Sequence, residues 1–244
     1  MFSPWVFDEY ERRYERLFHS IYPSRNSTGF PERNLTVNLC HAFEHDATAL
    51  FEMQFGSSNR EHLDGVLLSD RLENDRELAL IESKRFKSPS AVETIGKDIG
   101  RIYRCFYELK KENLVPETRR IDMSSVRTVF GCELADVWVE NRFKDTVCES
   151  YRNGTFLDVF KKDIFAGIAS GLRLDPWEAP RVADLIIKQV ERTIQYDVRG
   201  GLSPQWPHDY YLVSFFWVIE DEAELRDAFE AILHNDERDV RWDR

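Results

Sequence analysis

The residues that could carry chemistry gather in one stretch, residues 63–87, which reads LDGVLLSDRLENDRELALIESKRFK. Its two apolar parts, Leu63–Ser69 and Glu77–Lys84, flank a charged turn and predict an antiparallel hairpin. The second part is apolar on both faces, as in a strand covered on both sides, and becomes polar only at its end. Because side chains alternate along a strand, Glu82 and Lys84 there project from the same face.

The register of this hairpin brings two carboxylates together. A hairpin centred on residue 73 places Val66 opposite Leu80. In the same register Asp64 faces Glu82. Two like charges opposite each other destabilise a hairpin, so the pair predicts a cation between them. Mg²⁺ or Mn²⁺, held by one or two carboxylates and water, is the expected ion.

These residues resemble a known nuclease signature. Asp64, followed on the next strand by Glu82-Ser83-Lys84, resembles the D…ExK motif of the PD-(D/E)XK nuclease superfamily, which has the restriction-endonuclease-like fold. Leu63 stands where the name-giving pattern has proline. The resemblance spans about residues 35–132. It implies a metal-dependent nuclease that hydrolyses phosphodiester bonds of DNA, in restriction, defence or repair.

The resemblance also implies roles for individual residues. Asp64 and Glu82 would hold the metal ion, and the backbone carbonyl of Ser83 would be a third ligand. Lys84 would serve the attacking water, by orienting or deprotonating it, or would stabilise the charge on the phosphorus. The expected reaction is an in-line attack by metal-activated water.

The segment before the hairpin, Leu35–Phe55, has apolar residues at helical spacing and predicts one helix that ends at Gly56. In the superfamily that this chain resembles, a helix at this place often supplies a further acid. Glu44 would complete the site, with Glu52 as the second choice.

Two alternatives stay open. The main one is a nuclease fold with a silent site that binds DNA or protein. The lesser one is a zinc metallopeptidase, because residues 41–45 match H-x-x-E-H, in which His41 and His45 would bind zinc while Glu44 activates water. Its third ligand would have to come from further on, and the glycine-bearing surroundings of such peptidases are missing.

The helix expected from Ser90 to about Lys111 is basic on one face. The residues expected to follow a phosphate backbone are Arg85, Lys87, Lys97, Arg101 and Arg104. The alternative is a solvated face whose cations pair with Glu93, Asp98 and Glu108.

The whole chain predicts a mixed α/β fold, with a restriction-endonuclease-like core. This core would hold a central antiparallel hairpin in a mixed sheet flanked by helices, with extra helices in the C-terminal half. Gly96 and Gly100 are expected to let the basic helix approach the sheet closely. The remaining expected elements are helices over Trp5–Tyr22, Leu134–Val147, Thr155–Ala169 and Arg181–Tyr196, strands over Ser125–Cys132 and Tyr210–Ile219, and a final acidic helix.

The length predicts one domain, residues 1–244. The nuclease-like core would comprise about residues 35–132 and the strand 210–219, and about residues 134–196 would form a helical insertion or lobe.

Composition sets the remaining expectations. With 42% apolar residues the chain is not disordered. Its longest nearly apolar run, Tyr210–Ile219, is far short of the roughly 20 residues that cross a bilayer, and no leader is visible, so a cytoplasmic protein is expected. Four scattered cysteines predict reduced, packed thiols.

The net charge of −11 argues against a non-specific nucleic-acid binder. Residues 84–120, however, carry ten Lys or Arg against five Asp or Glu. A local basic segment in an acidic protein suits an enzyme that contacts phosphates at one place only. A homodimer is left open.

Overall fold

The computed structural model describes residues 4–20, 32–43, 46–55, 61–70, 75–86, 88–112, 121–139, 142–172, 174, 176–200 and 209–242. The α-helices and strands of this part follow in the order α1 (Pro4–Ser20), α2 (Glu32–Ala42), β1 (Ala47–Phe55), β2 (Glu61–Ser69), β3 (Arg76–Arg85), α3 (Ser90–Glu112), β4 (Val126–Val139), α4 (Arg142–Arg152), α5 (Phe156–Gly171), α6 (Ala179–Thr193), β5 (Gln195–Gly200), β6 (Asp209–Val218) and α7 (Ala223–Trp242).

The described strands form one mixed sheet in the order β1-β2-β3-β4-β6-β5. β3 and β4 are parallel, and each other neighbouring pair is antiparallel. A parallel pair needs a crossover connection, which α3 provides. In β3 the run Leu78–Ile81 is completely buried, as expected for a strand covered on both faces. The predicted mixed α/β class is confirmed.

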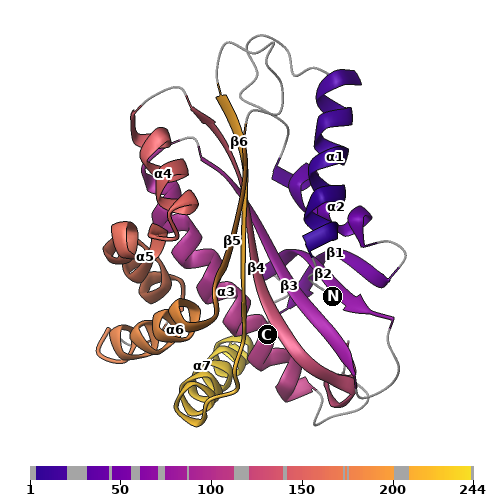
Figure 1. Cartoon of the computed structure of the whole chain (residues 1–244). Helices are drawn as coiled ribbons and strands as arrows, with labels where there is room; N and C mark the ends of the chain where they lie inside the picture. Colours follow the sequence, from indigo (N-terminus) through magenta and orange to yellow (C-terminus); the bar gives the residue numbers. More distant parts are fainter. Residues whose placement is uncertain are drawn as a thin grey trace.

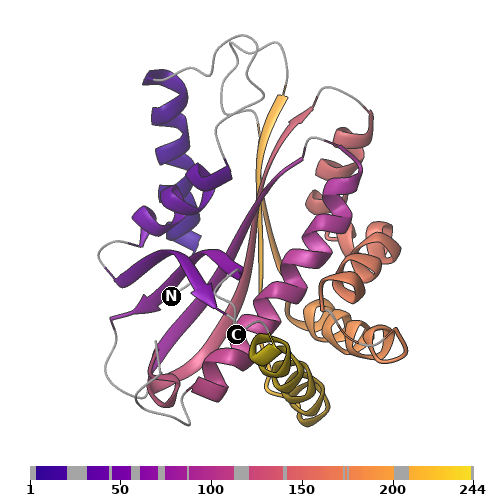
Figure 2. The same ribbon diagram turned by 180° about the vertical axis from the view of Figure 1, so that it is seen from behind.

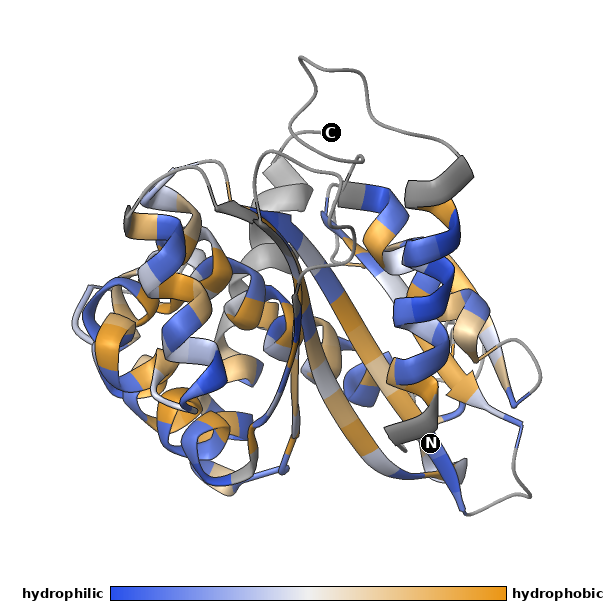
Figure 3. Ribbon diagram, turned by 45° about the horizontal axis from the view of Figure 1, so that its top comes forward, coloured by the Kyte–Doolittle hydropathy of each residue, from blue (hydrophilic) through white to orange (hydrophobic). Residues whose placement is uncertain are grey.

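Helices cover both faces of the sheet (Figure 1). α1 and α2 lie on one face and enclose a core with residues of β3, β4 and β6 such as Ile81, Leu134 and Phe216. α3 to α7 lie on the other face and enclose the larger core, in which α3 contacts β3 and β4 directly. Seen from behind, α3 runs along the sheet with α5 outside it (Figure 2). The central strands are hydrophobic over much of their length because both faces are covered (Figure 3).

The hairpin of β2 and β3 has the predicted register. Val66 pairs with Leu80 and Leu68 with Leu78, so the predicted register is confirmed over this stretch. The ladder ends at the pair Gly65 and Ile81, one residue before Asp64 and Glu82 would pair directly. The two carboxylates therefore lie just beyond the ladder.

The helix predicted over Leu35–Phe55 is wrong in its second half. α2 ends at Ala42, and Ala47–Phe55 forms the edge strand β1, paired with β2. The predicted helix would bury Leu50 and Phe51, but their side chains are 47% and 43% exposed. Glu52 consequently lies on this strand, exposed and with a positive φ of 53°, rather than on a helix.

Two helix predictions in the C-terminal half also need correction. The strand predicted to end at Cys132 continues as β4 to Val139, so residues 134–139 are strand and α4 begins only at Arg142. The helix predicted over Arg181–Tyr196 ends at Thr193 and is followed by the unpredicted strand β5. The helical region is thus shorter at both ends, because β6 offers pairing partners to both β4 and β5.

The glycines of α3 serve a different contact from the one predicted. A Cβ added to Gly96 would lie 2.2 Å from the carbonyl oxygen of Ile164 and 2.9 Å from the Cα of Gly167, both on α5. Gly96 and Gly167 therefore let α3 and α5 cross with their backbones in contact. The close approach is between two helices and not between a helix and the sheet.

Two expectations from composition can be compared with the structure. The four cysteines are buried and free, as predicted. Within the described ranges, no helix combines the length and the apolar composition that crossing a bilayer requires.

Candidate functional site

Asp64 is held at the end of β2 by the strand beside it. The backbone N–H and the hydroxyl of Ser83 both donate to its Oδ2, each at 2.8 Å. The hydroxyl of Thr36 on α2 donates in turn to the Ser83 hydroxyl at 3.1 Å. A Cβ at Gly65 would lie 2.4 Å from the Thr36 methyl group, so this glycine lets α2 come close enough for that bond. Three elements thus fix the direction of one carboxylate.

Glu82 projects from the other face of β3, toward α3, where its side chain is only 2% exposed. Arg101 of α3 donates to its Oε1 at 2.8 Å, and the second Arg101 nitrogen lies 3.1 Å from Oδ1 of Asp98, also 2% exposed. Lys84 lies one step along β3, its Nζ 4.0 Å from Oδ2 of Asp98. The Arg101 guanidinium therefore bridges two buried carboxylates.

A fourth acid, Glu133, was not predicted from the sequence. It lies on β4 directly beside Glu82, is completely buried, and projects to the same face because the two residues are partners in the parallel ladder. Neither of its carboxylate oxygens has a hydrogen-bond partner among the described residues. We call Asp64, Glu82, Asp98 and Glu133 the acid cluster.

Burial and mutual repulsion perturb the two strand acids. Burial raises the pKa of Glu82 well above the usual carboxyl value; Arg101 opposes this, and Asp98 and Asp64 add to it. Burial also raises the pKa of Glu133, with Asp98 and Glu82 adding to it and Lys84 opposing. Both groups therefore hold a proton more tightly than free carboxyls unless a cation offsets their charge.

This perturbation predicts a pH dependence of stability. A carboxyl whose pKa is higher in the folded state binds more protons there, so the free energy of unfolding falls as pH rises above the unfolded pKa of about 4.3. We expect the chelator-treated protein to lose stability as the pH rises from about 5 toward neutrality, and Glu133→Gln to lose less.

Urea unfolding of both proteins across that range measures the difference. Glu11 and Asp197, whose pKa values are also raised mainly by burial, are present in both proteins and cancel in the comparison. Equal slopes for the two proteins would contradict the assignment of Glu133 as a perturbed acid.

The acid cluster fits a hard divalent cation in the kind of its donors but not in their present arrangement. Mg²⁺ and Mn²⁺ prefer carboxylate and water oxygens, which the cluster offers, and both oxygens of Glu133 lack a hydrogen-bond partner in the described part of the chain. However, no three His, Cys, Asp or Glu side chains within the described ranges are placed to hold a metal ion together. Glu82 and Asp98 form ion pairs with Arg101 and not with a metal ion.

The basic residues predicted to contact phosphates lie in different surroundings. Lys97 is about half exposed and pairs with Glu93. Arg104 is buried and donates to Glu61 at 2.7 Å. Arg85 lies on the α1 side of the sheet, 3.6 Å from Asp136, and Lys87 falls outside the described residues. Arg101 and Arg104 thus face protein carboxylates, and contact with DNA stays a prediction.

Glu44 and His45 lie outside the described residues, in the link between α2 and β1. The structure therefore gives no position for the further acid, nor for two of the three residues of the zinc-peptidase motif. His41, the remaining one, is exposed on the last turn of α2.

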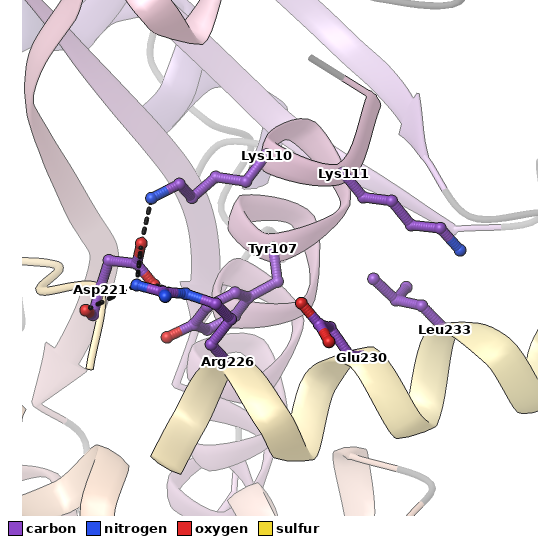
Figure 4. Close-up of a pocket in the computed structure, with 7 residues that line it drawn as sticks. All are labelled: Tyr107, Lys110, Lys111, Asp221, Arg226, Glu230 and Leu233. Carbon is purple, nitrogen blue, oxygen red and sulfur yellow. Dashed lines mark hydrogen bonds and ion pairs between the residues drawn. The ribbon is translucent and has the colours of Figure 1, made fainter. Parts of the chain in front are cut away.

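A separate hollow of about 560 Å³ lies between α3 and α7 (Figure 4). Its lining residues are Tyr107, Lys110, Lys111, Asp221, Arg226, Glu230 and Leu233. Asp221 forms ion pairs with both Lys110 and Arg226, and although burial alone would raise the pKa of Asp221, these bonds hold it below its usual value. No predicted site residue lines this hollow, and Asp221 links α3 to α7 through its ion pairs with Lys110 and Arg226.

No protein-family model matches this sequence, and neither a curated protein nor a solved structure matches it. The geometry of the acid cluster is therefore what a functional proposal has to rest on.

Proposed function

We propose that this chain is a metal-dependent nuclease that hydrolyses phosphodiester bonds of DNA, with Mg²⁺ or Mn²⁺ as its cofactor. The observation that carries the proposal is the end of the hairpin. There Asp64 and Glu82 lie just past the last paired residues of β2 and β3, and their charges act on each other. Lys84 lies 4.0 Å from Asp98, and Asp98 and Glu133 are two further buried acids beside Glu82. Retaining several carboxylates in a buried place is costly unless they serve a cation.

Each residue has a role that its position supports. Asp64, oriented by Ser83, and Glu82 would hold the ion, with the Ser83 carbonyl as the third ligand that the resemblance implies. A divalent cation in such a site polarises a phosphoryl oxygen and lowers the pKa of bound water. Lys84, within reach of Asp98, would orient the water or stabilise charge on the phosphoryl group.

Arg101 has to leave Glu82 before a cation can reach that carboxylate. Its side chain is 35% exposed, so it has a route to solvent, and a DNA phosphate is a ligand that a guanidinium binds well. Substrate binding and completion of the metal site would then be linked through one side chain.

The same contact favours a second candidate, a nuclease fold that binds DNA without cutting it. If Arg101 keeps Glu82 and Asp98, the guanidinium replaces the metal permanently and the site is silent. Both candidates bind DNA, but only the first hydrolyses it.

A cleavage assay separates them. The purified chain is incubated with supercoiled plasmid, linear duplex, single-stranded DNA and RNA, each with Mg²⁺, with Mn²⁺ and with a chelator. We expect cleavage of DNA that requires the metal. Salt-dependent DNA binding without cleavage in any metal would support the silent module, and the absence of both binding and cleavage would overturn the proposed function.

A further inference from the structure

Glu133 is a buried acid whose carboxylate has no hydrogen-bond partner among the described residues. Its side chain has no exposed surface, and neither carboxylate oxygen accepts a hydrogen bond from any described residue. Buried carboxylates in folded proteins are nearly always paired with a cation or hydrogen-bonded, because a buried unpaired polar group costs free energy. A cation bound beside Glu133 would offset the cost of burying its charge.

The cations nearby form ion pairs with other acids, and Lys84 acts on Glu133 through its charge. Arg101 bridges Glu82 and Asp98, and the nearest carboxylate oxygen to Lys84 in an ion pair is Oδ2 of Asp98, at 4.0 Å. The acid cluster thus has four carboxylates and two basic side chains on this side of the sheet. When Arg101 moves to solvent, the acid cluster loses one of its two positive charges, and a divalent cation would replace that charge.

The sheet also gives Glu133 the right place for such an ion. It is the parallel partner of Glu82, and neighbouring strands lie roughly 5 Å apart. Side chains of partners on adjacent strands project to the same face, here the face that α3 covers. Two carboxylates on neighbouring strands can therefore approach one cation from two sides.

We propose that Glu133 is a further ligand of the divalent cation, contributed by β4, which binds the ion together with Glu82 when Arg101 moves away. This role rests on the proposed function, since it concerns the same metal. It adds a strand that the D…ExK motif does not include.

Binding of Mn²⁺ to the full chain, measured by calorimetry and by the electron paramagnetic resonance of free Mn²⁺, tests this role without any nuclease assay. Glu133→Gln keeps the size of the side chain and removes its charge. We expect it to weaken Mn²⁺ binding at least tenfold, about 1.4 kcal/mol, and to reduce the rise in melting temperature that Mn²⁺ causes.

Asp136→Asn is the matched control, because Asp136 is a buried acid three residues further along β4 but on the opposite face, near Arg85. We expect this variant to bind Mn²⁺ as the wild type does, within about twofold. Circular dichroism checks that each variant is folded, and Glu133→Asp, which keeps the charge, should retain more affinity than Glu133→Gln.

The outcomes are distinguishable. Equal Mn²⁺ affinity in wild type and Glu133→Gln would overturn the role of Glu133 and leave the proposed function standing. An equal loss in Asp136→Asn would show a general effect of altering β4, and would also overturn it. A wild-type chain that binds no Mn²⁺ would overturn the proposed function together with this role.

Discussion

Replacing Glu82 with glutamine is expected to lower metal-dependent cleavage of DNA by about 10³-fold or more, about 4 kcal/mol of barrier. The proposed ion is held by Asp64 and Glu82, and an amide is a much weaker ligand for a hard cation than a carboxylate. The fold should be kept, because glutamine still accepts the hydrogen bond from Arg101 through its carbonyl oxygen. Cleavage rates at saturating Mg²⁺ and urea unfolding of the chelator-treated protein measure the two effects.

Glu77→Gln is a matched control for this variant. Glu77 lies on the same strand but at its other end, away from the acid cluster. It should change the cleavage rate by less than about threefold. If Glu82→Gln cuts DNA as fast as the wild type, Glu82 is not a metal ligand, and the observed activity belongs to another site or to a contaminant.

The hairpin could be predicted because two short apolar runs flank a charged turn. Leu78–Ile81 contains no polar side chain, as is typical of a strand covered on both faces, and the turn before it indicates the centre of the hairpin. The positions of Asp64, Glu82 and Lys84 at one end followed from that register. The long helix α3 was equally well specified, because its apolar stripe, including Ile95, is completely buried.

β1 could not be predicted in the same way, because its residues satisfy two periods. Ala47, Leu50 and Phe51 have the spacing of a helix face, whereas Ala47, Met53 and Phe55 lie on one face of a strand. Pairing with β2 decides between these readings, and this pairing is a long-range contact that a local pattern does not contain. The alternation of Thr48, Glu52 and Gln54 with apolar residues was the available signal.

The acids of β4 and α3 were missed for a related reason. The apolar pattern predicts a strand that ends at Cys132, because the next residue, Glu133, is polar, whereas the buried strand β4 continues to Val139. The helical pattern predicts Asp98 only as an ion-pair partner on a solvated helix face; it does pair with Arg101, but its side chain is buried. A charged residue within an apolar run is thus better treated as a candidate site residue.

The basic face of α3 illustrates how burial changes the meaning of a charge pattern. Its spacing suggested a line of cations toward solvent, but Arg101 and Arg104 turn to Glu82 and Glu61 on the sheet. Both contacts tie α3 to the hairpin that carries Asp64. The geometry of the acid cluster therefore depends on the position of α3. The other side of α3 packs against α5.

This dependence makes the crossing of α3 and α5 the most sensitive structural point. At Gly96 an added Cβ would lie 2.2 Å from a backbone oxygen of α5, which cannot rotate away. At Gly100, one turn further along the same helix, the nearest atom to such a Cβ is 3.5 Å away, an ordinary contact. Both glycines lie in the same α-helix, so they differ only in how much room a Cβ would have.

Gly96→Ala is therefore expected to lower the free energy of unfolding by about 3 kcal/mol, since overpacking against a backbone exceeds the gain of up to about 1 kcal/mol from helix propensity. The melting temperature should fall by roughly 10 °C. Gly100→Ala should instead leave stability unchanged or raise it by up to about 1 kcal/mol. Urea unfolding of the three proteins decides this: equal effects of the two substitutions would show that α3 and α5 do not cross at Gly96. If they do cross there, Gly96→Ala should also weaken Mn²⁺ binding, because it displaces the helix that carries Asp98 and Arg101.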